Sequence, residues 1–283
     1  MDIKAATQRY EARLRAALPL VIDADLDFKH EQMALAPFPF LRATFYRWSQ
    51  RWGHCCPHLA STPVVLGVGD LHVENYGTWR DAEGRLVWGV NDFDEATLVP
   101  YAVDLVRLAT SAGLASNAHD LSSELKDAAG ALVAGYAEGL AGSAGPGRDK
   151  QGPAGPGGHK QGPAGPGGHK QSPGGPFVLA ERHATLRQMA TSEPRDPVHF
   201  WAKMQALPEV APDSYPPDAV RAVLAALPTD EVTDTTTRSR RAGLGSLGRP
   251  RLVALAQWRG ATVAREVKAL LPSSDSPLSP FSS

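Results

Sequence analysis

Polar side chains gather where two short strands are expected to end. The two apolar runs are residues 64–68 and 86–90, and the polar side chains that follow them are Asp70, His72, Asn75, Asp92 and Asp94. Strand ends hold side chains rigidly, while the loops that follow leave them accessible. A carboxylate can accept the proton of an attacking hydroxyl group, and hard oxygen ligands can hold Mg²⁺ against phosphates. We therefore expect this stretch to be a site of phosphoryl transfer.

The spacing of these residues separates a base from metal ligands. Asn75 lies five residues after Asp70, and Asp92 ends the next strand. Catalytic Asp, metal-binding Asn and metal-binding Asp follow one another in this order in kinases. Asp70 is therefore the predicted base, with His72 beside it in the catalytic set. The predicted Mg²⁺ ligands are Asn75, Asp92 and Asp94.

This stretch resembles the aminoglycoside phosphotransferase and choline kinase branch of the kinase-like superfamily. The catalytic loop of that branch reads H-G-D-x-H-x-x-N, and Val68 stands here where a His is usual. Asp104 occupies the place of a second, structural Asp before a helix. The residues that match the loop are Gly69, Asp70, His72 and Asn75.

A glycine-rich segment near the end of the chain supplies the second signal. It contains Gly243, Gly245, Ser246 and Gly248, and an expected hairpin over residues 251–268 follows it and ends at Lys268. A dinucleotide-binding fold would need a strand before the glycines and a helix after them. A glycine-rich loop joined to a hairpin with a Lys instead resembles the small lobe of kinases, where both contact the phosphates of ATP. We therefore expect these residues to bind ATP.

The order of the two signals is inverted relative to ordinary kinases. In this order the chain is similar to the bacterial family known as domain of unknown function 2252. Its members carry G-D-x-H-x-x-N-F-G and N-D-F-D-E early, then V-G-x-G-S-x-G-x-R and a Lys late. The matching segments here are residues 69–77 (Tyr76 replaces Phe), 91–95, 241–248 (Pro250 intervenes after them) and Lys268.

The resemblance implies an α+β, protein-kinase-like, circularly permuted fold. A mostly helical large lobe would be followed by an incomplete small lobe built on a β-hairpin. Family members continue well beyond the Lys, whereas this chain ends fifteen residues after Lys268. We therefore expect a truncated small lobe.

Two other classes of protein remain open. Loss of part of the small lobe would leave a non-catalytic nucleotide-binding protein on the same fold. Binuclear metallophosphoesterases also begin with a strand followed by Asp-x-His, although the later histidines of this chain form no matching ligand groups. A short polar motif after a strand can also be plain turn chemistry. We favour an ATP- and Mg²⁺-dependent phosphotransferase that acts on an unidentified small-molecule or protein acceptor.

Composition excludes several partners. The 283 residues are 42% hydrophobic and 21% charged, with a formal net charge of -1, as in a globular protein without a basic field for nucleic acid or anionic membranes. The first residues are charged where a signal peptide would be apolar, so we expect a cytoplasmic protein that contacts neither nucleic acid nor membrane. Cys55 and Cys56 are adjacent and cannot easily form a disulfide with relaxed geometry.

The chain divides into five predicted segments. A ten-residue Gly/Pro-rich unit, GPAGPGGHKQ, recurs in the second segment, which is expected to be disordered. The segments are residues 1–141 (half of the large lobe, with the catalytic loop), 142–176 (the insert), 177–240 (helical remainder), 241–270 (glycine-rich loop and hairpin) and 271–283 (disordered tail). Helices are expected over residues 3–18, 38–52, from Pro100, 121–140 after a cap at Asp120, 177–189, 198–207 and 217–227. On the second of these helices, Arg42 is placed where it could enter a phosphate site.

Overall fold

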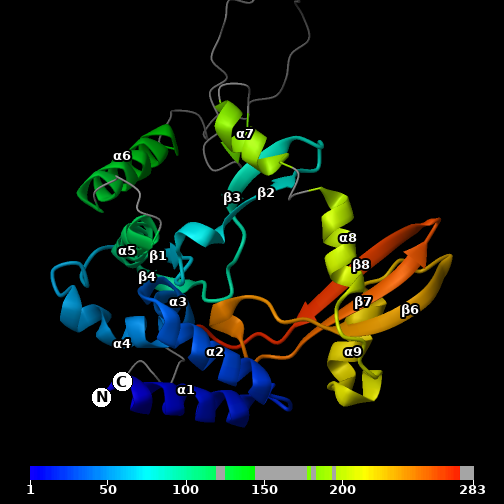
Figure 1. Cartoon of the computed structure of the whole chain (residues 1–283). Coiled ribbons are helices and arrows are strands. Elements are labelled where there is room, and N and C mark those ends of the chain that lie inside the picture. The colour runs from blue at the N-terminus through cyan, green and yellow to red at the C-terminus, as the bar shows by residue number, and fades with distance from the viewer. Residues whose placement is uncertain (119–124, 144–176, 180–182, 193–195, 275–283) are drawn as a thin grey trace, which may run out of the picture.

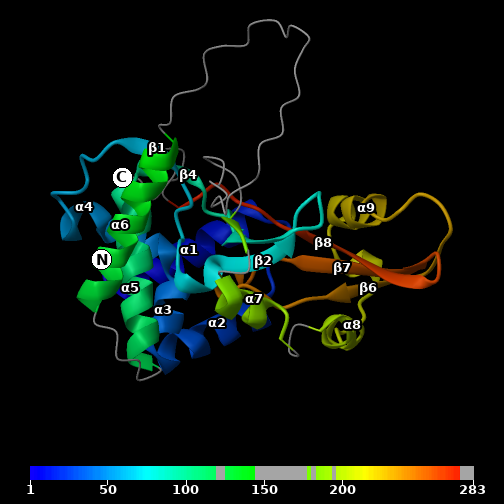
Figure 2. The same ribbon diagram turned by 90° about the horizontal axis from the view of Figure 1, so that it is seen from above.

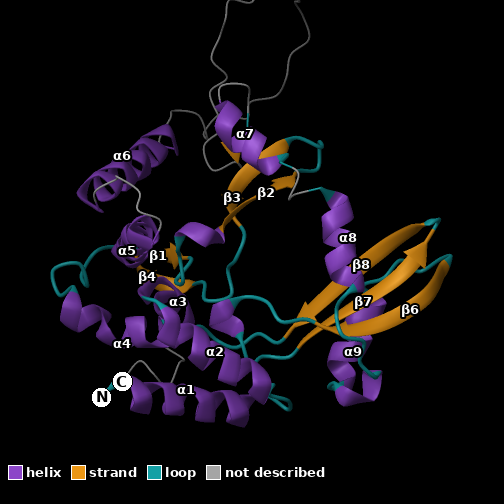
Figure 3. Cartoon of the chain, viewed as in Figure 1, coloured by secondary structure: helices purple, strands orange, loops and turns teal. Residues whose placement is uncertain are grey.

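The computed structural model describes residues 1–118, 125–143, 177–179, 183–192 and 196–274, and these residues form a mixed α+β fold (Figure 1). Most helices gather on one side of the molecule and a twisted sheet lies on the other (Figure 3). The longer helices are α1 (Ile3–Ala17), α2 (Asp23–Leu35), α3 (Pro37–Ala43), α4 (Phe45–Cys55), α5 (Ala102–Ala118), α6 (Leu125–Ser143), α7 (Ala184–Ala190), α8 (Pro197–Gln205) and α9 (Pro217–Ala225). The strands are β1 (Val64–Gly67), β2 (Tyr76–Arg80), β3 (Leu86–Val90), β4 (Thr97–Pro100), β5 (Phe177–Val178), β6 (Val232–Ser239), β7 (Arg251–Trp258) and β8 (Ala261–Lys268).

The first helix follows its predicted pattern. Its N-cap is Asp2, whose Oδ1 accepts the backbone N–H of Ala5 at 2.8 Å. The buried stripe consists of Ala6, Tyr10 and Leu14. It packs on α4 through Tyr10 and Tyr46, whose rings stack with centroids 4.4 Å apart.

The aromatic segment forms two helices instead of the single helix expected over residues 38–52. The break lies at Thr44, where the backbone leaves helical geometry at φ −125° and ψ 38°. Its hydroxyl donates to the carbonyl oxygen of Phe40 at 2.7 Å, which satisfies the end of α3. The chain therefore changes direction at Thr44, between α3 and α4. The end of α3 lies at the pocket described below.

Two small antiparallel sheets surround the predicted polar stretch. β1 pairs with β4, and β2 pairs with β3. The strands expected over residues 64–68 and 86–90 are β1 and β3, whereas β2 and β4 were not predicted. Pro100 ends β4 and α5 begins at Ala102, so the prediction that Pro100 opens the helix is wrong by two residues. A proline lacks an N–H and is tolerated at the end of an edge strand.

The helical prediction for residues 177–189 is wrong at its start. Phe177 and Val178 form β5, which extends the β2–β3 pair, and α7 begins only at Ala184. Phe177 meets Trp88 of β3 edge-to-face at 6.3 Å between ring centroids. This contact between residues far apart in sequence overrides local helical spacing.

The C-terminal sheet has three strands in the order β6–β7–β8, so the expected hairpin is only part of it. β7 is buried on both faces: Leu252, Ala254 and Ala256 pack with residues of α9, while Val253 and Leu255 pack with Met204 of α8. The view from above places α8 and α9 on opposite sides of this sheet (Figure 2). The turn between β7 and β8 has positive φ at Arg259 and Gly260, which matches the twist of a hairpin.

β6 was not expected within the segment predicted to be the helical remainder of a lobe. Its sequence, VTDTTTRS, is polar, and its pairing with β7 shifts register between Thr233 and Thr236. Positive φ at Asp234 accompanies this bulge. The glycine-rich segment consequently connects two neighbouring strands, β6 and β7.

Several predictions concern residues outside the described ranges. These residues include nearly all of the Gly/Pro-rich insert, the cap expected at Asp120 and the last nine residues of the tail. Among the described helices, none combines the length and apolar composition needed to cross a membrane.

Candidate functional site

Three segments that are distant in sequence meet around one pocket. The residues after β1, those after β3 and the glycine-rich loop before β7 all contribute side chains to it. Of the predicted site residues, those that line the pocket are Asp70, His72, Asn75, Asp92, Asp94, Gly243, Gly245 and Ser246. Gly248 packs against Leu26 just behind the loop, and Lys268 reaches the pocket through Asp94.

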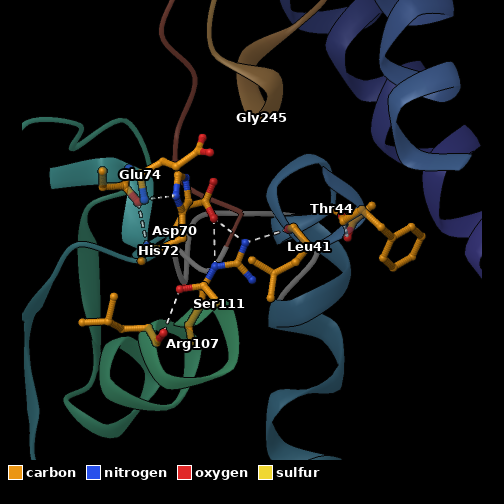
Figure 4. Close-up of polar contacts among 12 residues, drawn as sticks. Leu41, Thr44, Asp70, His72, Glu74, Arg107, Ser111 and Gly245 are labelled. Atoms are coloured by element: carbon orange, nitrogen blue, oxygen red, sulfur yellow. Dashed lines mark hydrogen bonds and ion pairs between the residues drawn. The ribbon is translucent and has the colours of Figure 1, made fainter. Parts of the chain in front are cut away.

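Asp70 is held by an arginine that was not among the predicted site residues. Arg107 of α5 is fully buried and donates to Asp70 Oδ1 from Nε at 2.8 Å and also from Nη2 (Figure 4). The same Nη2 donates to the carbonyl oxygen of Leu41 at 2.9 Å. Burial raises the pKa of Asp70 to about 6 even though Arg107 acts to lower it. The carboxylate is therefore a stronger base than that of an exposed aspartate, and it is fixed in one orientation.

Asp104 fixes the loop that presents Asp70. Its two carboxylate oxygens accept the backbone N–H groups of Val68 at 2.7 Å and Gly69 at 2.8 Å. Gly69 has φ +82°, and a Cβ atom there would lie 2.4 Å from the carbonyl oxygen of Glu95. Only glycine fits this position without strain. The structural role that the sequence assigns to Asp104 therefore matches its contacts.

His72 and Asn75 tie the turn that follows Asp70. The backbone N–H of His72 donates to Asn75 Oδ1 at 2.6 Å, and the N–H of Glu74 donates to His72 Nδ1 at 3.2 Å. Both side chains are 4% exposed, and burial, with Arg42 and Arg107 adding to it, lowers the pKa of His72 to about 3. His72 is thus a neutral cap of the turn, and Asn75 Oδ1 has one lone pair left for a ligand.

The segment after β3 carries the carboxylates predicted to bind Mg²⁺. Asp92 is exposed, and its Oδ1 accepts the N–H of Asp94 at 3.3 Å. Asp94 forms an ion pair with Lys268, 174 residues away in sequence. The predicted proximity of Lys268 to the polar stretch is therefore observed.

The donor set suits a hard cation that shares its ligands with a phosphate. No group of three or more His, Cys, Asp or Glu side chains in the described ranges could hold a metal by itself. Mg²⁺ commonly takes one or two carboxylates and completes its shell with phosphate oxygens and water. Asp92 and Asp94, with the free lone pair of Asn75, fit that pattern.

The glycine-rich loop lies directly over Asp70. A Cβ atom on Gly245 would lie 3.2 Å from Asp70 Oδ2 and 3.2 Å from the carbonyl oxygen of Arg42. Lys29 of α2 holds the loop there, because its Nζ donates to the carbonyl oxygen of Gly245 at 3.1 Å. About 40 Å³ of free space remains, room for a few water molecules and not for a triphosphate. A nucleotide therefore requires this loop to lift.

Sequence reasoning missed the cations that organise the pocket. Arg107 follows Asp104 by three residues, so both lie on one face of α5 beneath the polar loop, a spacing that could have indicated it. Lys29 lies far from any motif, and no local pattern pointed to it.

Comparison with protein-family models finds a match to part of the chain. Residues 22–151 match the model of a family described as an uncharacterized protein conserved in bacteria (DUF2252). The matched range contains the polar stretch and Asp104, and it ends before the glycine-rich loop. No curated protein matches the chain. No solved structure matches it either.

Proposed function

We propose that this protein is an ATP- and Mg²⁺-dependent phosphotransferase with a kinase-like, circularly permuted arrangement. One observation carries the proposal: the glycine-rich loop lines one pocket with Asp70, Asp92 and Asp94, and Lys268 pairs with Asp94, although these segments lie far apart in sequence. A base and carboxylates alone would not bind a triphosphate, and a glycine-rich loop with a Lys would not bind Mg²⁺.

The topology of the C-terminal sheet supports the same proposal. The glycine-rich loop connects β6 with β7, a tight turn leads to β8, and Lys268 ends β8. In protein kinases a glycine-rich loop covers the phosphates and the phosphate-binding Lys lies on the third strand. The order of strand, loop, strand, strand and Lys is the same in this chain.

Each residue then has a role that its contacts permit. Asp70 accepts the proton of the acceptor hydroxyl, because a carboxylate with a pKa of about 6 is mostly ionised at neutral pH and is a better base than an exposed one. Asp92, Asp94 and Asn75 hold Mg²⁺, which when bound neutralises charge on the phosphates. Lys268 turns from Asp94 to the phosphates. His72 positions the turn. The acceptor of the phosphoryl group is a small molecule or protein in the cytoplasm.

A non-catalytic nucleotide-binding protein is the second candidate. The pairing of Asp70 Oδ1 with the buried Arg107 favours this reading, because it restricts the access of an acceptor to the base. A metallophosphoesterase is the third candidate and is less well supported, because no cluster of His and carboxylate ligands is present in the residues that the structure describes.

ADP formation from ATP in the presence of Mg²⁺ separates the three candidates. We expect turnover in the intact chain, a loss of at least a hundredfold in Asp70→Asn, and unchanged turnover in Asp230→Asn, which removes an exposed carboxylate on the far turn of the sheet. Circular dichroism checks that each variant folds. Nucleotide binding without turnover would identify the second candidate. Mn²⁺-dependent hydrolysis of p-nitrophenyl phosphate without nucleotide would identify the third.

A further inference from the structure

Two arginine side chains line the pocket with hydrogen-bond donors to spare. Arg249 follows Gly248 and is only 5% exposed; its Nη2 donates to Glu95 Oε1 at 3.2 Å. Its Nε and Nη1 are buried without a hydrogen-bond partner among the described residues. Arg42 of α3 forms an ion pair with Glu74 through Nη1, and its Nε is likewise buried and unpartnered there.

Buried guanidinium N–H groups that lack an acceptor in a pocket indicate an anionic ligand. A buried N–H group without an acceptor costs free energy, so nearly all such groups in native proteins are met by protein, water or a ligand. The planar guanidinium fork matches the spacing of oxygen atoms in phosphate and carboxylate groups. Arg42 and Arg249 come from different elements, and the loop of residues 243–248 lines the pocket with them.

A second buried cation, Lys29, acts together with Arg249 on Tyr10, which lines the same pocket. Lys29 is 2% exposed and lies 4.6 Å from the ring centroid of Tyr10. Burial acts to raise the pKa of Tyr10, but Lys29 and then Arg249 outweigh it, so the pKa of Tyr10 is lowered. An anion placed between the loop and these cations would be stabilised by the same field.

Of the four carboxylates that line the pocket, three are paired with cations, and the fourth, Asp92, is exposed. Asp70 is neutralised by Arg107, and Asp94 is paired with Lys268. Glu95 is shared, since its Oε1 accepts from Arg249 and its Oε2 accepts the backbone N–H of Ser274 at 2.7 Å. An anion bound by Arg42 and Arg249 would therefore leave the pair between Asp70 and Arg107 in place.

We infer that Arg42 and Arg249, together with the glycine-rich loop, form a subsite for a phosphate group. The phosphate belongs either to the nucleotide or to a phosphorylated acceptor. Its assignment to a substrate rests on the proposed function, whereas the subsite itself rests on the buried donors. If the acceptor carries the phosphate, the protein acts on phosphorylated small molecules.

Titration with inorganic phosphate tests the subsite on the intact chain without nucleotide or metal. The thermal midpoint is followed against phosphate at constant ionic strength, with chloride as the reference anion. We expect a saturable rise in the wild-type protein and an equal rise in the control Arg259→Gln, whose side chain is 56% exposed and lies at the far turn of the sheet. The half-saturating phosphate concentration should rise at least tenfold in Arg249→Gln and in Arg42→Gln.

The outcomes separate this inference from the proposed function. If Arg249→Gln does not fold, Arg42→Gln decides, because its side chain is 24% exposed and tolerates replacement better. Equal half-saturation in wild type and both variants, or no saturable response to phosphate, overturns the subsite. Competition between phosphate and MgATP assigns the subsite to the nucleotide, and simultaneous binding assigns it to the acceptor. The two proposals can therefore fail separately. Phosphate binding without MgATP binding supports the subsite and counts against the proposed function, and MgATP binding without saturable phosphate binding does the reverse.

Discussion

Removing Arg107 should destabilise the protein in a way that depends on the charge of Asp70. Arg107 is fully buried and donates twice to Asp70 Oδ1 and once to the carbonyl oxygen of Leu41. Breaking a buried ion pair by removing one partner typically costs about 3–5 kcal/mol, because the other charge remains buried and unpaired. We expect Arg107→Met to lower the free energy of unfolding by about this amount at pH 8, and Asp70→Asn to cost far less, because the folded protein already raises the pKa of that carboxyl group to about 6 and so favours a neutral side chain there.

The double variant should recover much of this loss. Replacing both partners removes both buried charges, so Asp70→Asn/Arg107→Met should be more stable than the sum of the single effects predicts, by about 3 kcal/mol. The exposed pair between Arg259 and Asp230 is the matched control, and its coupling energy should stay below about 1 kcal/mol.

The effect of pH provides a second check. A carboxyl group whose pKa is higher in the folded protein costs stability as pH rises from its unfolded pKa to its folded pKa. For Asp70 the wild-type window runs from about pH 4 to about pH 6 and corresponds to about 3 kcal/mol. Without Arg107 the folded pKa rises further, so Arg107→Met should lose additional stability between pH 6 and pH 8.

Urea unfolding at pH 5.5 and pH 8 measures these quantities. Circular dichroism reports the helices, and tryptophan fluorescence reports the six tryptophans together, among them Trp48, whose ring lies 5.1 Å from the Arg107 guanidinium. Single effects that add within about 0.5 kcal/mol, with no change between the two pH values, would refute a buried ion pair between Asp70 and Arg107.

The remaining predictions concern the loops around the pocket. His72→Asn keeps an N-cap acceptor but removes the imidazole ring. Because the folded pKa of His72 is about 3, the wild-type protein loses stability as pH falls below 6.5. Unfolding titrations of the variant should show about 3 kcal/mol less loss of stability between pH 6.5 and pH 4. Asp104→Ala leaves two backbone N–H groups without an acceptor and should cost about 2–5 kcal/mol in urea unfolding, whereas a cost below 0.5 kcal/mol would contradict those bonds. Gly248→Ala places a Cβ atom 2.4 Å from Leu26 Cδ2 at φ +89° and should cost about 1–3 kcal/mol, and an unchanged stability would show that the loop does not pack there.

Sequence reasoning was most informative where local chemistry restricts the backbone. Asp70, Asn75 and Asp104 lie in short loops and at a helix start, where residue type and spacing restrict the backbone, and the contacts of Asp104 follow that expectation. The strands before and after the polar turn, residues 64–68 and 86–90, were found because their apolar runs are bounded by turn residues.

What sequence reasoning missed depends on contacts between distant segments. β6 was missed because its sequence is polar and neither of its faces is apolar enough to indicate a strand. It is held in place by its pairing with β7. β5 exists through its pairing with β3. Arg107 and Lys29 are charged residues in the interior, and their positions become intelligible only once Asp70 and the carbonyl oxygen of Gly245 lie beside them. Burial of a charge is a tertiary property that no local pattern reveals.

Titration of the intact chain with MgATP tests the central claim most directly. Binding measured by calorimetry should require Mg²⁺, should be abolished in Asp92→Ala and should weaken at least tenfold in Lys268→Met, while Asp70→Asn keeps its affinity because the base does not hold the nucleotide. Asp92 is exposed, so its replacement leaves the fold intact and serves as a clean variant. No MgATP binding by the folded wild-type chain, or equal binding by wild type, Asp92→Ala and Lys268→Met, would contradict the proposal that these residues form one nucleotide site.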